Sequence, residues 1–187
     1  MNARSNQHDT RDGNALRPKE LRARLDFSDQ RLLAECDVQF HRTGGPGGQH
    51  RNKVVSAVRL VHRPSGLVVT ATERRSQHEN KANALWRLRE ALAVGVRVTP
   101  PAEVVWPASV QVREGRLRVG DGNPGLWHAV ALALDELAAC AGDVRGAAAR
   151  LGVTGSSLTR FLADHPKAWT AANAIRRAAG LQPLHAS

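Results

Sequence analysis

The chain has 187 residues, of which 42% are hydrophobic, so it can bury a real core and is long enough for one ordinary domain or two small ones. It carries 27 Lys and Arg residues against 17 Asp and Glu, a formal net charge of +10 that favours polyanionic partners, nucleic acid first among them. No apolar run approaches the roughly 18 residues of a membrane-spanning helix, and there is no secretory leader, so we expect no membrane partner and a cytoplasmic location.

The N-terminal segment is polar, and we predict a disordered or weakly ordered arm over residues 1–26, with a short helix around residues 21–25. The hydroxyl of Ser28 is placed to cap a second helix over residues 29–35. The ordered part of the chain is therefore expected to begin near residue 27.

Apolar and polar residues then alternate with period two, which predicts strands. Val38 and Phe40 form the apolar face of the first strand, and Val58 and Leu60 that of the second. A Pro-Ser-Gly turn separates the second strand from a β-branched stretch, so residues 56–72 are predicted to form a hairpin.

Ser76 and Glu79 form a capping-box pattern that starts a helix. The apolar stripe of this helix is Ala82, Leu85, Leu88 and Leu92. We therefore predict an α+β fold, a small antiparallel sheet with a packed helix, over residues 27–98.

A proline- and glycine-rich connector follows over residues 99–125, with a weak hairpin near residues 110–119. Residues 126–187 are rich in Ala and Leu at helical spacing, which predicts a helical domain. Its helices are expected at residues 126–141, 144–151, 156–164 and 169–179.

Residues 142–162 resemble a helix-turn-helix. Ala148 and Gly152 stand four apart, where close helix packing needs small residues. The expected core residues are Val153, Leu158 and Phe161, and the expected exposed residues are Ser156, Ser157, Thr159 and Arg160. A compact helical bundle follows the same packing rules, so this pattern leaves two interpretations open, a plain bundle or nucleic-acid contact by residues such as Arg160.

The stretch over residues 43–52 cannot hold regular structure, because its glycines and proline oppose it. It is no phosphate-binding P-loop, because Gly48 is followed by Gln49, and Lys53 by Val54 in a predicted strand. A purely structural loop is the alternative, although four glycines and a proline in five positions are more than a connector needs.

Gly44-Gly-Pro-Gly-Gly-Gln-His-Arg-Asn-Lys53, followed by Ser56-Ala-Val-Arg59, resembles the catalytic domain of class I peptide chain release factors. The later run Glu73-Arg-Arg-Ser-Gln-His-Glu-Asn-Lys81 resembles the second signature of that domain. Two motifs in one order and spacing, within residues 35–92, make this likeness far more specific than a glycine run alone.

The resemblance implies hydrolysis of the ester that joins a nascent peptide to P-site tRNA, with Gly47, Gly48 and Gln49 as the catalytic residues. The Gln49 backbone N–H would stabilise the developing charge, and its side-chain amide would place the water. The implied partners are the ribosome, at its peptidyl-transferase centre and ribosomal RNA, and the P-site peptidyl-tRNA. We expect no cofactor and no metal, because the histidine spacings fit no familiar metal site. We also expect the protein to be a monomer.

Basic residues near the two motifs are the candidate nucleic-acid ligands, since Lys and Arg contact phosphates. With Arg160 from the helical region, they are Arg42, His50, Arg51, Lys53, Arg74 and Arg75. Cys36 and Cys140 are expected to be small core residues rather than nucleophiles.

Only a few tens of residues precede the catalytic unit, too few for the separate domain with which class I release factors read stop codons. We therefore expect codon-independent release on stalled ribosomes. Two alternatives stay open. One is a nucleic-acid-binding regulator that acts through the helix-turn-helix, and the other is a ribosome-binding accessory that does not cleave.

Overall fold

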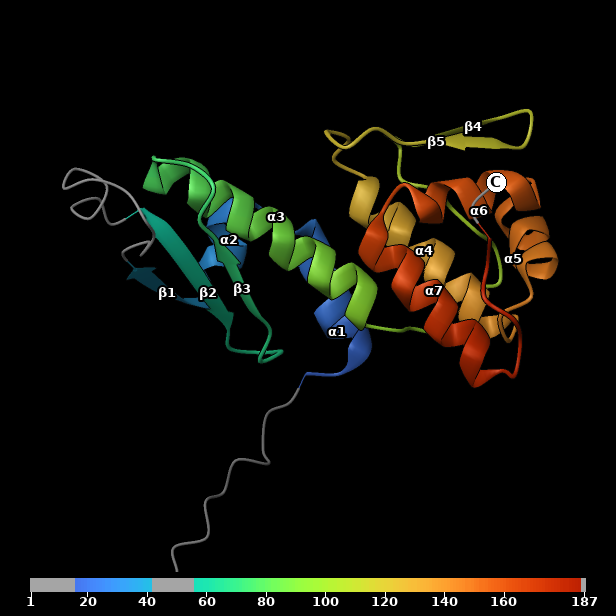
Figure 1. The fold of residues 1–187 in the computed structure, drawn as a ribbon, viewed down its shortest axis with the longest axis horizontal. Helices are drawn as coiled ribbons and strands as arrows, with labels where there is room; N and C mark the ends of the chain where they lie inside the picture. Colours follow the sequence, from blue (N-terminus) through green and yellow to red (C-terminus); the bar gives the residue numbers. More distant parts are fainter. Residues whose placement is uncertain (1–15, 42–55, 186–187) are drawn as a thin grey trace, which may run out of the picture.

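The computed structural model describes residues 16–41 and 56–185. Within them the predicted α+β fold is confirmed, and Figure 1 shows a small sheet at one end of an elongated molecule and a group of helices at the other. The elements are α1 (Pro18–Arg22), the 3-10 helix η1 (Ala23–Asp26), α2 (Asp29–Ala34), β1 (Cys36–His41), β2 (Ala57–His62), β3 (Val68–Ala71), α3 (Gln77–Gly95), β4 (Gln111–Arg113), β5 (Arg116–Arg118), α4 (Leu126–Ala139), α5 (Val144–Leu151), α6 (Gly155–Ala163) and α7 (Pro166–Ala178).

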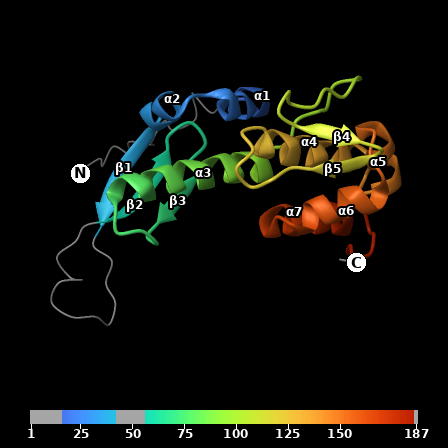
Figure 2. The same cartoon turned by 90° about the horizontal axis from the view of Figure 1, so that it is seen from above.

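The three-stranded sheet is antiparallel, in the order β1-β2-β3. Its register aligns Val38 with Leu60, and Leu60 with Val69. Val58 and Leu60 are fully buried on one face, as their alternation predicts. That face lies against α3, which packs on β2 and β3 (Figure 2).

Two residues of the predicted apolar faces are exposed, and Val38 is only partly buried. Phe40 is 48% exposed, because it lies near the end of the edge strand β1, which packs beside α2, whereas α3 covers β2 and β3. Ala82 is exposed on α3, and Ala84 is buried in its place, with Leu85, Leu88 and Leu92 buried as predicted.

Helix α3 joins the two ends of the molecule. It begins as predicted after Ser76, whose hydroxyl accepts a hydrogen bond from the Glu79 backbone N–H at 3.4 Å. Its 19 residues run on from the sheet to pack against α4 and α7 (Figure 1). Trp86 of α3 meets Trp127 of α4 with ring centroids 5.1 Å apart, and one hydrophobic cluster extends through both ends.

Charged groups reinforce this junction at Asp135 of α4, which is only 3% exposed. Its carboxylate accepts hydrogen bonds from Arg22 Nη1 at 2.7 Å, Arg97 Nη1 at 3.0 Å and the Val98 backbone N–H at 3.2 Å. Arg22 belongs to a helix inside the segment predicted as a weakly ordered arm. Residues 18–26 are thus helical and tied to α4, and the first helix begins three residues before the predicted start at residue 21.

The C-terminal helices lie close to their predicted positions, and α4 is buried among α3, α5, α6 and α7. α7 begins at Pro166, before the predicted start at residue 169, because proline suits the first helical position. In the part of the chain that the structure describes, no helix is both long and apolar enough to cross a membrane.

The turn between α5 and α6 differs from its predicted packing. Ala148 is buried as expected, but Gly152 is exposed, and a Cβ built on it would meet nothing within 4 Å. Gly152 has a φ of +67° at the C-cap of α5, so glycine serves the left-handed conformation there and not close helix packing.

Candidate functional site

Seven of the residues predicted for the site lie outside the residues that the structure describes. They are Arg42, Gly47, Gly48, Gln49, His50, Arg51 and Lys53. Their predicted roles stay predictions, and the described part of the site is the framework on either side of them.

That framework is one end of the sheet. β1 ends at His41, which pairs with Ala57 at the start of β2, so both connections to residues 42–55 lie at the same sheet end. β3 ends nearby, because Val58 of β2 pairs with Ala71. The second signature follows β3 directly and leads into the N-terminus of α3 (Figure 2).

Asn80, in the first turn of α3, connects the two signatures. Its side chain is fully buried, and its Nδ2 donates to the Ser56 carbonyl at 2.6 Å and to the Arg74 carbonyl at 2.8 Å. The Asn80 Oδ1 accepts from the Arg74 backbone N–H at 3.0 Å. One side chain thus fixes the residue that follows 42–55 and the backbone of the second signature. No local pattern around Asn80 indicates this role, although Asn80 stands inside the second signature.

Arg74 and Arg75 lie at this same sheet end, and both side chains are exposed. Among the residues the structure describes, neither guanidinium pairs with a carboxylate. The neighbouring Glu73 is committed elsewhere, to Arg87 at 2.8 Å. Burial raises the pKa of Glu73, but backbone N–H donors and the charges of Arg87 and Arg74 outweigh this effect, so the net pKa lies below 4.5. The two arginines are therefore available to bind phosphate.

A buried polar cluster lies at the opposite end of β2. The fully buried His62 places Nε2 at 3.0 Å from a Glu35 carboxylate oxygen and Nδ1 at 2.7 Å from the Ser65 hydroxyl. Glu35 also accepts two hydrogen bonds from Arg24, at 3.0 and 3.1 Å. Burial lowers the pKa of His62 and Glu35 only partly restores it, so His62 is neutral at pH 7 and holds the sheet to α2.

Arg160 lies on α6, among the C-terminal helices and away from the sheet end that carries Arg74 and Arg75 (Figures 1 and 2). Arg160 and Ser156 are exposed as predicted, but Ser157 and Thr159 are only partly exposed. The Ser157 hydroxyl accepts a hydrogen bond from the Leu117 backbone N–H of β5 at 2.8 Å. The β4–β5 hairpin thus covers the start of α6, the part of a recognition helix that would contact bases.

The two cysteines have the character of packing residues. Cys36 is buried, its Sγ donates to the Leu32 carbonyl at 3.3 Å, and burial raises the pKa of its thiol to about 11. Burial also raises the pKa of Cys140. Both thiols are therefore protonated at neutral pH, which disfavours a nucleophilic role. Within residues 16–41 and 56–185, no three His, Cys, Asp or Glu side chains gather in a way that could hold a metal ion.

Comparison with known proteins matches residues 32–103 to the RF-1 domain family. The chain is 50% identical over 58 residues to peptide chain release factor 1 of Caldicellulosiruptor bescii, which is 31% of this chain and 16% of that factor. It is 52% identical over 60 residues to the chloroplastic peptide chain release factor PrfB1 of Arabidopsis thaliana, which is 32% of this chain and 13% of that factor.

A third relative, peptide chain release factor 2 of Petrotoga mobilis, is 53% identical over 58 residues, 31% of this chain and 16% of the factor. The similarity thus spans about one sixth of the length of these relatives. It is nevertheless high within the segment that contains both signatures. Residues 32–103, with their Gly-Gly-Gln motif, therefore match the RF-1 domain family, and part of the chain is similar to peptide chain release factors.

Proposed function

We propose that this protein hydrolyses the ester bond of peptidyl-tRNA on the ribosome without reading a codon. The observation that carries the proposal is the Gly47-Gly48-Gln49 motif, inside a segment that matches the RF-1 domain, in a chain that is 50% identical over 58 residues to a peptide chain release factor. On this proposal, the partners within the ribosome are ribosomal RNA at the peptidyl-transferase centre and the P-site peptidyl-tRNA.

In the proposed mechanism the protein mainly positions the reactants. Gly47 and Gly48 lack side chains, so their backbone can approach the ester closely. The Gln49 backbone N–H donates a hydrogen bond to the charge that develops in the transition state. Its side-chain amide, which can both donate and accept, orients the attacking water. Ribosomal RNA and the tRNA hydroxyl complete the site.

The described framework supports this proposal. Asn80 anchors the Ser56 carbonyl at the sheet end where residues 42–55 return to β2. Arg74 and Arg75, exposed at the same sheet end, would contact phosphates of the tRNA acceptor end. Fixed ends restrict the positions that the catalytic groups can take, which helps them to place a water within a narrow range.

Codon independence is the second part of the proposal. The match to the chloroplastic release factor PrfB1 covers 60 residues, and α4 and α7 pack directly on α3. We propose the domain division of residues 1–26, 27–98, 99–125 and 126–187, and a monomer that acts in the cytoplasm on stalled ribosomes. The alternative of a regulator with α6 in a DNA groove is disfavoured, because the hairpin covers the start of α6.

Peptide release from purified bacterial ribosomes holding labelled peptidyl-tRNA tests the proposal. Three messages are compared. The first ends in the P site, the second continues with a sense codon, and the third continues with a stop codon. We expect release from the truncated message, with no gain from a stop codon. Release that requires a stop codon would refute codon independence, and no release on any message would refute hydrolysis by the chain alone.

A further inference from the structure

The outer face of the β4–β5 hairpin carries a regular set of arginines. The register pairs Gln111 with Arg118 and Arg113 with Arg116, so these four side chains share one face and alternate with inward-facing residues. We call this set the arginine face, namely Gln111, Arg113, Arg116 and Arg118. All four are exposed, and with Glu114 they line a hollow of about 490 Å³.

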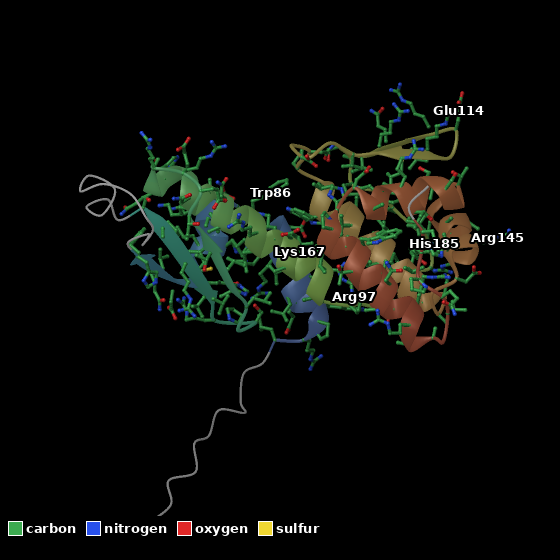
Figure 3. All side chains as sticks on the ribbon, viewed as in Figure 1. Trp86, Arg97, Glu114, Arg145, Lys167 and His185 are labelled. Atoms are coloured by element: carbon green, nitrogen blue, oxygen red, sulfur yellow. The ribbon has the colours of Figure 1, made fainter. Side chains whose placement is uncertain are left out.

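The arrangement of charges on this face has no structural compensation. Arg113 lies directly opposite Arg116, and like charges in such a cross-strand pair destabilise a hairpin. Arg113 donates to the Gln111 side chain at 2.8 Å, and among the described residues none of the three guanidinium groups pairs with a carboxylate. The acidic neighbour, Glu114, lies in the turn at the tip of the hairpin (Figure 3). An uncompensated cationic face of this kind is suited to an external anionic partner.

The hairpin is held firmly on α6, so its arginines are presented on a fixed backbone. The Thr154 backbone N–H donates to the Gly115 carbonyl at 2.8 Å, and the Leu117 backbone N–H donates to Ser157 at 2.8 Å. Leu117, on the inner face, is only 6% exposed. Gly115 has a φ of +70°, and a Cβ there would lie 3.1 Å from the Thr154 side chain, so glycine is required at this close contact.

We propose that the arginine face binds the phosphate backbone of RNA. All three cations are arginines, whose planar forks match phosphate oxygens bidentately. Two residues along a strand are separated by about 6.6 Å, and cross-strand neighbours by about 5 Å, which places the cations at spacings comparable to those of successive phosphates. The choice of RNA over an acidic protein rests on the proposed function, since the ribosome exposes mainly RNA.

This surface is separate from the catalytic framework. The hairpin lies along the C-terminal helices, whereas β1 ends and β2 begins at the far end of the sheet (Figures 1 and 2). Arg160 is exposed on α6, one turn after Ser157, the residue that holds β5. The arginine face would thus bind RNA at a second site, while the end of the sheet near residues 42–55 approaches the ester.

The test is RNA binding by the full chain without ribosomes, measured by fluorescence anisotropy with a labelled single-stranded 20-nucleotide RNA across a salt series. The triple variant R113Q, R116Q, R118Q is compared with the control variant K19Q, R145Q, R177Q. The control removes the same charge from three other exposed positions that make no ion pair within the described residues. Near-UV circular dichroism verifies that both variants are folded.

For single strands, the slope of log Kobs against log salt concentration changes by about 0.7 per phosphate contact. The loss of three arginines in the hairpin variant should therefore reduce the magnitude of this slope by about 2, whereas the control variant should keep nearly the original slope. Equal losses in the two variants would overturn the proposal, as would equally effective displacement of the RNA by polyglutamate. A parallel peptide-release assay keeps the two proposals distinct. Release that depends on Gln49 can persist even if the hairpin arginines do not bind RNA, and RNA binding by these arginines can persist even if no peptide is released.

Discussion

Replacement of Asn80 with alanine tests whether this side chain fixes the ends of the two signatures. The fully buried amide makes three hydrogen bonds, two donated by Nδ2 to the Ser56 and Arg74 carbonyls and one accepted from the Arg74 N–H. Each such bond contributes about 1 kcal/mol net, so Asn80→Ala should lower the free energy of unfolding by about 3 kcal/mol. For a chain of this size, each kcal/mol shifts the Tm by about 2–4 °C, which predicts a fall of about 6–12 °C.

Thermal and urea unfolding, followed by far-UV circular dichroism, measure this loss. The matched control is Asn83→Ala, one turn along α3, whose side chain is half-buried and makes one weak contact with Glu73 at 3.5 Å. The control should stay within about 0.5 kcal/mol of the original protein. A Tm within 2 °C of the original for Asn80→Ala would refute the assigned role of the amide.

A positioning role for Asn80 also predicts a defect that instability alone cannot explain. At a temperature where both variants are more than nine-tenths folded, Asn80→Ala should release peptide more slowly at saturating protein, because residues 42–55 have lost a fixed end. Asn83→Ala should release at the original rate. Equal release rates would limit Asn80 to a structural role.

Two further predictions concern stability. Asp135→Asn leaves the guanidinium groups of Arg22 and Arg97 without their buried carboxylate. It should lower the free energy of unfolding, measured in urea, by about 3–5 kcal/mol. A loss below about 1 kcal/mol would contradict the role of Asp135 at this junction. Because the folded-state pKa of His62 lies below 6.5, the unfolded chain binds the proton first, so stability should fall as pH drops below about 6.5. His62→Gln should flatten the unfolding free energy between pH 6.5 and 5, and an unchanged slope would exclude His62 as its source.

Asp26→Asn is the matched control for Asp135→Asn. Asp26 also belongs to an ion pair, with His128 at 2.8 Å, but its side chain is 74% exposed. Its loss should change the free energy of unfolding by less than about 0.5 kcal/mol.

Local patterns along the sequence were sufficient to predict much of the fold. The alternation at Val58 and Leu60 placed β2 correctly, since one strand face must be buried. Ser28 and Ser76 marked the starts of α2 and α3 because a hydroxyl acceptor satisfies a free N–H of the first turn. Such signals are local and do not depend on how the elements pack.

Other features depend on contacts between distant segments, which no local pattern encodes. The burial of Asn80 follows from its approach to Ser56, 24 positions earlier. The partial cover of Ser157 comes from β5, 40 positions earlier at Leu117. The spacing of Gly152 predicts close packing, because sequence spacing cannot distinguish a small residue needed for space from one needed for a positive φ.

The most direct test of the account is single-turnover release of a labelled peptide from ribosomes stalled at the end of a truncated message, with the original protein and with Gln49→Ala. The matched control is Gln39→Ala, at an exposed glutamine of β1 in the same domain. We predict that Gln49→Ala lowers the release rate by at least about 100-fold, as expected when a group that acts in the transition state is lost, while Gln39→Ala releases at the original rate. Equal release by the Gln49→Ala variant and the original protein would contradict the catalytic role of the Gly-Gly-Gln motif.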